Sequence, residues 1–251
     1  MMKTKWRRIV NYIMDKLILF SIISLSICWT VQVNGSVNVN YIDDYTQQFA
    51  NKAILQYNRY MHNQNDSNLA LKVAESLHIV IALYGYNLTK NVQHYARLEI
   101  YVLNKYIDDS ANRGKSCGYV SRLLAEAYFQ ADEDQKAEKV ALSLIKLSKK
   151  YPLTEDLFIA DETLGLIALQ HHNVSKADNY LLAAGNVPYS RTINVWAPNV
   201  RLLHALLIKK QWNAATIFCK EIEKNQHLDY SSWIHDFKKD IIPEMSSSLR
   251  Y

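Results

Sequence analysis

Apolar residues recur three and four positions apart through most of the chain from Tyr41 onward. Two examples are the runs from Leu69 to Tyr84 and from Tyr95 to Tyr106, where this spacing places the apolar side chains on one face of an α-helix. The pattern therefore predicts amphipathic helices that pack through their apolar faces. We expect ten helices, near residues 42–62, 68–84, 90–108, 118–131, 133–150, 155–171, 174–184, 198–209, 212–225 and 230–241.

Polar and turn-forming residues separate these runs. Examples are the stretches 63–68, 85–90 and 108–118, and the pair Tyr151-Pro152. Most of the predicted connections have about two to eight residues, a length typical of antiparallel neighbouring helices. The pattern therefore favours an all-α fold of consecutive antiparallel helix pairs.

Several of the predicted helix starts carry residues that can satisfy free backbone N–H groups. Asp132 followed by Gln135 resembles a capping box, and Thr154 precedes two acidic residues that suit the positive end of a helix. Pro198 fits a first-turn position, where its missing N–H costs nothing. We therefore interpret the acidic run at residues 132–134 as a helix start and not as a metal site.

Three segments of the chain, 118–150, 157–188 and 196–225, are similar to one another. Their small residues Ala137, Ala177 and Ala215 stand 40 and 38 residues apart. A small residue at this place lets two helix backbones cross closely near a turn, while larger residues farther along fill the groove. The similarity predicts one helix-pair unit that is repeated along the chain.

These repeats resemble those of tetratricopeptide repeat proteins. The best match runs from Leu164 to Gly185 and includes the Leu-Gly pair of that family together with Ala168 and Ala177. The segment 209–218 looks like the turn and second-helix start of the family. The resemblance implies helix pairs stacked as a short tetratricopeptide-like solenoid.

The repeats depart from the family pattern in period and at two positions. The spacing of 38 to 40 residues is longer than the family's period of about 34. Asp132, His172 and Lys210 stand where the family has a turn glycine, and Asp161 replaces the first-helix tryptophan.

The C-terminal stretch from Gly165 to Met245 is also similar to a set of uncharacterised bacterial repeat proteins. Those proteins have an Ala-Ala-Gly turn, a Trp-Ala-Pro-Asn helix start and a final helix that contains tryptophan. The matching residues are Ala183-Ala184-Gly185, Trp196-Ala197-Pro198-Asn199 and Trp233. This resemblance implies a bacterial exported protein and carries no activity with it.

A stack of helix pairs is curved, and its concave face is an extended binding surface. If the first helix of each pair lines that face, as in the family, its polar and aromatic side chains would contact a peptide. The alternative is that these residues are solvated positions of ordinary amphipathic helices. The candidate partner-binding residues are Tyr119, Arg122, Glu126, Gln130, Glu162, Gln170, Arg201 and His204.

Composition supports a helical fold. The 251 residues include only 6 glycines and 4 prolines, whereas all-β folds need many tight turns. With 49% hydrophobic and 21% charged residues, the main body fits neither a disordered chain nor a polytopic membrane protein.

The N-terminal residues are typical of a targeting segment. Residues 1–35 hold five positive charges and one negative charge, and the 17 residues from Leu17 to Val33 carry none. Such a segment is a secretory signal, here with a cleavage site near Gly35, or an uncleaved membrane anchor. A helix of 17 residues spans about 26 Å, slightly less than a hydrocarbon core of about 30 Å. Both alternatives predict a body that is periplasmic or anchored on the outer face of the cytoplasmic membrane.

The targeting segment also accounts for most of the net charge. The whole chain has a formal charge of +5, and without residues 1–35 the balance is 24 positive against 23 negative charges. We therefore expect no nucleic-acid partner, and membrane contact only through residues 17–33 if they are not cleaved. Residues 36–245 are expected to form the helical repeat domain, and residues 246–251 a short tail.

Candidate chemistry is sparse. Gly114-Lys115-Ser116 lacks the glycine that a phosphate-binding loop has five residues earlier, and the adjacent His171 and His172 have no third metal ligand at helical spacing. Cys117 and Cys219 are interpreted as small half-buried thiols, although an exported protein could bridge them. We expect no catalytic residue, no cofactor and no metal.

The sequence thus favours a non-catalytic exported helical-repeat protein that binds a protein or peptide. One alternative is an envelope-associated hydrolase on a helical-repeat-like scaffold, which would need a cluster of perturbed carboxylates or a Ser/His pair. Another is a structural subunit that self-assembles through its helical surface.

Overall fold

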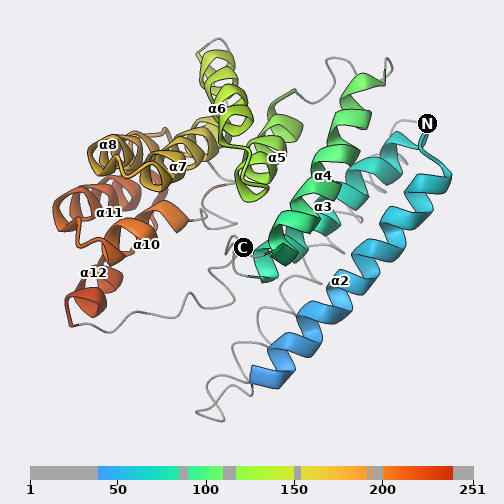
Figure 1. Ribbon diagram of the computed structural model, residues 1–251. Coiled ribbons are helices and arrows are strands. Elements are labelled where there is room, and N and C mark those ends of the chain that lie inside the picture. Colours follow the sequence, from blue (N-terminus) through green and yellow to red (C-terminus); the bar gives the residue numbers. More distant parts are fainter. Residues whose placement is uncertain are drawn as a thin grey trace, which may run out of the picture. The chain divides into compact units, whose positions relative to one another are not determined.

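The computed structural model describes residues 39–84, 90–109, 117–149, 154–190, 193 and 200–239. The chain divides into two compact units, Met1–Gln47 and Gln48–Tyr251, and the first is described only from residue 39. The described residues form ten α-helices and no β-strand (Figure 1). The helices are α2 (Val39–His62), α3 (Ser67–Leu83), α4 (Lys90–Asp108), α5 (Cys117–Gln130), α6 (Asp134–Ser148), α7 (Thr154–Gln170), α8 (Val174–Gly185), α10 (Arg201–Ile208), α11 (Trp212–Gln226) and α12 (Ser231–Lys238).

The all-α class is confirmed for the described residues. Each helix expected from the apolar spacing corresponds to one observed helix, and the bounds differ by at most three residues. Helix periodicity is a strong signal here because most of the helices bury one apolar face against a neighbour.

Helices that follow one another in the sequence pack in pairs. α3 packs on α4, α5 on α6, and α7 on α8, while α11 packs on both α8 and α12. One core cluster contains Leu77 of α3 and Leu103 of α4, and a second contains Leu202 and Leu206 of α10. Each such fully buried leucine stabilises the fold by roughly 1.5–3 kcal/mol relative to an exposed one.

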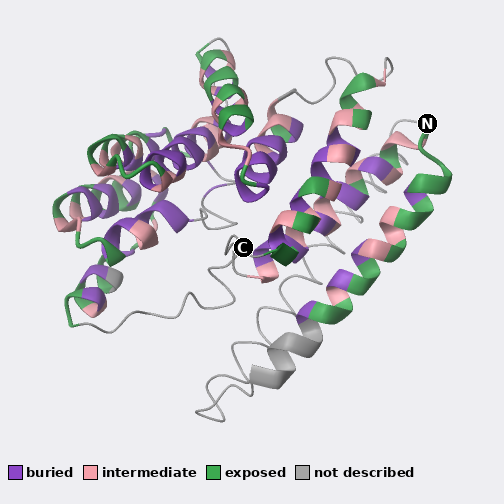
Figure 2. Ribbon diagram, in the orientation of Figure 1, coloured by how far each residue is buried: buried purple, intermediate pink, exposed green. Residues whose placement is uncertain are grey.

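Helix α7 is enclosed on nearly every side. Eleven of its 17 residues are buried, because α5, α6, α8 and α10 all pack against it (Figure 2). Its buried residues include the carboxylates of Asp156, Asp161 and Glu162. These charges therefore need partners inside the protein, which is unusual for a helix of this length.

The same turn ends α5, α7 and α10. Asp132, His172 and Lys210 have left-handed φ angles of 65°, 59° and 58°. In each turn the N–H of this residue donates to the carbonyl three positions earlier, and the next N–H donates to the carbonyl five positions earlier, at 2.8–3.1 Å. This is the Schellman pattern, in which glycine is the usual left-handed residue. The three positions are those where the sequence lacks the expected turn glycine.

A fully buried alanine lies five residues after each of these turns. Ala137, Ala177 and Ala215 are all 0% exposed, in the first turns of α6, α8 and α11. No larger side chain would fit there without moving the neighbouring helix. The three similar segments of the sequence thus share one turn and one close helix contact.

One expectation about a helix start is wrong. The N-cap of α6 is Glu133, whose side chain makes no capping bond, because Asp132 is taken up by the left-handed turn that ends α5. At α7 the expectation is confirmed, because Glu155 and Asp156 follow Thr154 in the first turn of the helix. Asp66 and Asn173 accept capping hydrogen bonds from the backbone N–H groups of Leu69 and Lys176, at the starts of α3 and α8.

Within the described residues, no helix is both long enough and apolar enough to cross a membrane. The predicted targeting segment at residues 1–35, Pro198 and the predicted tail at 246–251 lie outside the described residues.

Candidate functional site

The predicted binding residues of α5 form a stripe along one face of that helix, at positions 119, 122, 126 and 130. The Tyr119 hydroxyl donates to Glu75 Oε1 of α3 at 3.1 Å. The Arg122 Nε atom lies 3.1 Å from Asp156 Oδ1 of α7. This stripe therefore connects α5 to the helices on both of its sides.

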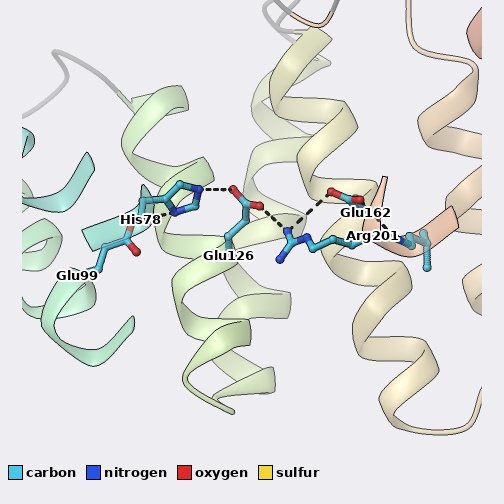
Figure 3. A network of polar contacts seen from close by, with 6 residues as sticks. His78, Glu99, Glu126, Glu162 and Arg201 are labelled. Carbon is cyan, nitrogen blue, oxygen red and sulfur yellow. Dashed lines mark hydrogen bonds and ion pairs between the residues drawn. The ribbon is translucent and has the colours of Figure 1, made fainter. Parts of the chain in front are cut away.

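Glu126, the third residue of the stripe, is the centre of a buried polar network (Figure 3). Its Oε1 atom accepts a hydrogen bond from Arg201 Nη2 of α10. Its Oε2 atom lies 3.6 Å from His78 Nε2 of α3, and His78 Nδ1 lies 3.3 Å from Glu99 Oε1 of α4. One carboxylate thus links helices that are far apart in the sequence.

Glu162 of α7 completes the network on the far side of Arg201. Its Oε2 atom lies 3.8 Å from Arg201 Nη2, and its Oε1 atom accepts a hydrogen bond from the backbone N–H of Leu202 at 3.3 Å. Because Leu202 and Arg201 are both in the first turn of α10, Glu162 holds the positive end of that helix. We call the five side chains of His78, Glu99, Glu126, Glu162 and Arg201 the buried network.

Four of the five side chains of the buried network lie almost entirely out of water, whereas that of His78 is 21% exposed. Glu99 is 0% exposed, Glu162 2%, Glu126 5% and Arg201 6%. Moving a charge out of water costs several kcal/mol, and ion pairing repays that cost only when the contacts are well made. Three carboxylates face one guanidinium and one imidazole, so their full ionisation leaves a net negative charge inside the protein.

The surroundings shift the pKa values of these groups. Burial alone would lower the pKa of His78, but the Glu99 and Glu126 carboxylates outweigh it and raise this pKa to about 9. Burial raises the pKa of Glu162 to about 7, against the opposing effect of Arg201. Burial also raises the pKa of Glu99. His78 is therefore an imidazolium at neutral pH, where Glu162 is only partly ionised.

Two more carboxylates of α7 lie beside this network. Asp161 is 8% exposed, and burial raises its pKa to about 7. Burial also raises the pKa of Asp156, although the paired Arg122 lowers it. A Cβ atom added at Gly118 would lie 2.3 Å from Asp156 Oδ2, so a glycine is needed where α5 passes this carboxylate.

The structure separates the eight predicted binding residues into two groups. Glu126, Gln130, Glu162 and Arg201 are buried, so they do not form an open surface. The physical reason is that α3, α7 and α10 cover the α5 stripe, and α5, α6, α8 and α10 surround α7.

The other four residues reach the surface at least in part. Tyr119 is 38% exposed, and the Arg122 guanidinium lies 5.3 Å from the centre of its ring. The Gln170 amide donates to Asp132 Oδ1 at 2.9 Å. His204 is half-buried, with its ring centre 5.3 Å from that of Phe237. A role for these residues in partner binding stays a prediction.

The sequence analysis missed His78 and Glu99. Both lie in the segment that matches the repeat pattern only weakly, and helix periodicity does not tell which charges meet across helices. A signal was present, because His78 lies four residues after Ala74 and three before Ile81, and Glu99 lies three residues from both Ala96 and Val102, all of them apolar. A charge inside an apolar stripe is a sign of an internal ion pair.

The histidines and cysteines that the sequence offers as candidate chemistry lie at the following places. His171 and His172 are exposed in the turn after α7, and His171 Nε2 lies 2.9 Å from Asp134 Oδ2. Cys219 is a free, buried thiol, whereas the side chain of Cys117 lies outside the described part. Within that part, no group of three or more His, Cys, Asp or Glu side chains is placed to hold a metal ion.

Two hollows are found in the described part of the chain, and one of them lies beside the buried network. The gap beside Glu162, which Phe158, Leu181 and Phe218 help to line, is too small to hold a water molecule. A wider depression of about 580 Å³ lies near the end of α11 and is open to solvent, with lining residues Lys220, Glu223, Lys224, His227 and Asp229. Comparison of the chain with protein-family models, with curated proteins and with solved structures finds no match.

Proposed function

We propose that the protein is a non-catalytic binding protein, in which helix pairs stacked as a short tetratricopeptide-like solenoid hold a protein or peptide partner. The observation that carries this proposal is the repeated turn at Asp132, His172 and Lys210, each followed by a fully buried alanine. Units that share a turn and a close helix contact stack on one another, and such stacks expose extended surfaces suited to other polypeptides.

Tyr119 and Arg122 are the best-placed contact residues. Tyrosine and arginine are the residue types that most often dominate binding energy at protein interfaces. Here Glu75 holds the Tyr119 hydroxyl and Asp156 holds the Arg122 guanidinium, so both side chains are oriented before a partner arrives. This preorganisation lowers the entropy cost of binding.

The buried network supports a structural role for its carboxylates over a catalytic one. Carboxyl groups with a pKa near 7 can act as general acids, and Glu162 has such a pKa. A general acid must also reach its substrate, but the gap beside Glu162 is too small even for water. We therefore do not assign a hydrolytic role to this cluster.

Export of the body is a second part of the proposal. It is supported by the charge pattern of residues 1–35, with a basic flank followed by an uncharged apolar segment. Limited proteolysis of intact cells that carry a C-terminal epitope tag tests it, because an external protease reaches only an exported tag. A tag that stays protected until the cytoplasmic membrane is broken would overturn export.

Site-specific crosslinking in cells tests partner binding. A photoreactive phenylalanine in place of Tyr119 should yield a discrete crosslinked partner, and Arg122→Ala in the same chain should weaken that crosslink. The matched control carries the same photoreactive residue in place of Leu142 of α6, which is 49% exposed and distant in sequence. No specific product at position 119, or the same products at both positions, would contradict the proposal.

A further inference from the structure

The buried network has more acids than bases. The carboxylates of Glu99, Glu126 and Glu162 are offset by Arg201 and by His78 when it is protonated. The excess negative charge is avoided if one carboxyl group keeps its proton, because burying an unpaired charge is far more costly than burying a neutral acid. Closing this network therefore favours a bound proton.

Helix α10 forms one side of the network. Arg201 and Leu202 in its first turn contact Glu126 of α5 and Glu162 of α7. The helix has only eight residues, and it is held mainly by four buried leucines, at positions 202, 203, 206 and 207. If α10 moved away, both carboxylates would lose their contacts with it, and Glu162 would meet water and ionise as an ordinary acid.

We propose that α10 and the buried network form a proton-controlled clamp, in which α10 closes on α5 and α7 with uptake of a proton and loosens as the pH rises. The principal proton carrier is Glu162, because it contacts both residues of the first turn of α10. This inference concerns the isolated chain and does not depend on the proposed partner binding.

The direction of the effect follows from the pKa shifts. The pKa of Glu162 rises from its ordinary value of 4.5 to about 7 when the network is closed. Between these two values the open form has lost the proton while the closed form keeps it, so rising pH favours opening. His78 acts in the opposite direction, because its partners Glu99 and Glu126 lie on α4 and α5 and keep their places when α10 moves. Arg201 lowers the pKa of His78, so the departure of α10 would raise this pKa.

Other titratable groups surround the clamp. On α7 the neighbouring Asp161 has a pKa raised by burial, and on α10 the half-buried His204 has a pKa lowered by burial. His204 therefore opposes the effect of Glu162, but only below about pH 6.5. Burial raises the pKa of Tyr230, just before α12, and the nearby Glu162 carboxylate adds to that rise. In the described part of the chain, no charged group of α6 or α8 is among those that shift the pKa of Glu162.

Hydrogen exchange on the full chain at pH 5.5 and 8.5 tests the clamp. The amide protection of α10, corrected for the intrinsic exchange rate at each pH, is compared between the wild type and Glu162→Gln. Glutamine keeps the carbonyl oxygen that accepts from Leu202 N–H but cannot ionise. We expect the ratio of wild-type to variant protection in α10 to fall about 30-fold between the two pH values.

The matched control is Glu223→Gln, which removes an exposed carboxylate from α11. In this variant the amide protection of α10 should equal that of the wild type at both pH values. A ratio that is the same at pH 5.5 and 8.5 for Glu162→Gln would overturn the proposal. If that variant does not fold, the carboxyl ¹³C resonance of Glu162 in the wild type gives the answer, and titration near its ordinary pKa of 4.5 would overturn it equally.

Discussion

At position 126 a single carboxylate meets side chains from two other helices, the imidazole of His78 and the guanidinium of Arg201. Nothing about a glutamate on an amphipathic helix requires this arrangement. It exists because α3 and α10 both approach the same face of α5. At the scale of the residue, burial decides whether a charge is a surface group or a structural one and whether a side chain can be enlarged, and two positions on α7 test these two effects.

Gly165 is the first of these positions. A Cβ atom there would lie 2.2 Å from Leu202 Cδ2, so Gly165→Ala requires the buried Leu202 side chain or the two helices to shift. We expect a loss of about 1–3 kcal/mol in the free energy of unfolding, although alanine is the better helix former. Denaturant unfolding measures it, and Leu202→Ala in the same chain should make the glycine substitution less costly. If Gly165→Ala lowered the free energy of unfolding equally with and without the Leu202 side chain, the close contact between Gly165 and Leu202 would be contradicted.

Asp161 is the second position. It is 8% exposed, and burial raises its pKa to about 7. A carboxyl group with a raised pKa weakens the folded state as the pH rises from its ordinary value of 3.8 through about 7. Asp161→Asn should therefore stabilise the protein by about 1–3 kcal/mol at pH 8 and change little at pH 4.

Thermal unfolding at the two pH values checks the prediction for Asp161. The control is Glu223→Gln, in which the lost carboxylate is exposed and its removal should have the same small effect at both pH values. A gain for Asp161→Asn that does not depend on pH would show that ionisation of Asp161 is not the cause.

At the scale of the element, the repeated turn is the main feature. Four described helices end with a non-glycine residue in the left-handed region, where the side chain costs energy that glycine would not, and three of them share the repeated turn while α11 ends differently at His227. The apolar spacing predicted where these helices end, and the family resemblance pointed to the positions that lack glycine. The capping chemistry misled at Asp132, because the residue that looks like the start of α6 belongs to the turn that closes α5.

Glycine at these turns should stabilise the protein. His172 and Lys210 are both exposed, so replacing either one removes strain with little loss of contact. We expect His172→Gly and Lys210→Gly each to raise the free energy of unfolding by about 1 kcal/mol. Lys139→Gly, within the exposed face of α6, is the control and should lower it by about 1 kcal/mol. Loss of stability in the turn variants would contradict the backbone geometry.

At the scale of the unit formed by residues 48–251, the buried network connects helices from different pairs. α3 and α4 contribute His78 and Glu99, while α10, more than a hundred residues later, contributes Arg201. Removing one partner from such a network leaves a buried charge without an opposite charge beside it, and this strongly destabilises the folded state. The cost should far exceed that of losing an ion pair on the surface.

Arg201→Met tests this difference. We expect it to lower the free energy of unfolding by about 3–5 kcal/mol, since Glu126 and Glu162 both lose their guanidinium. Lys224→Met, which breaks the exposed pair with Glu221, should cost less than about 1 kcal/mol. Chemical denaturation of both variants at pH 7 gives the comparison, and similar costs would argue against a structural role for the network.

The sequence by itself determined the helices. The order and bounds of ten helices follow from the spacing of apolar residues. A helix that buries one face carries apolar residues three and four positions apart in its own sequence, so this signal is local. The similarity of the segments around Ala137, Ala177 and Ala215 also predicted where equivalent close contacts occur.

Only the tertiary structure decided what the polar residues do. Tyr119, Arg122, Glu126 and Gln130 form one stripe in the sequence, yet Tyr119 is exposed while Glu126 and Gln130 are buried. That difference depends on which other helices cover each position of α5. Such contacts join residues as far apart as Glu126 and Arg201, and their geometry comes from the packing of whole helices, which local periodicity does not contain.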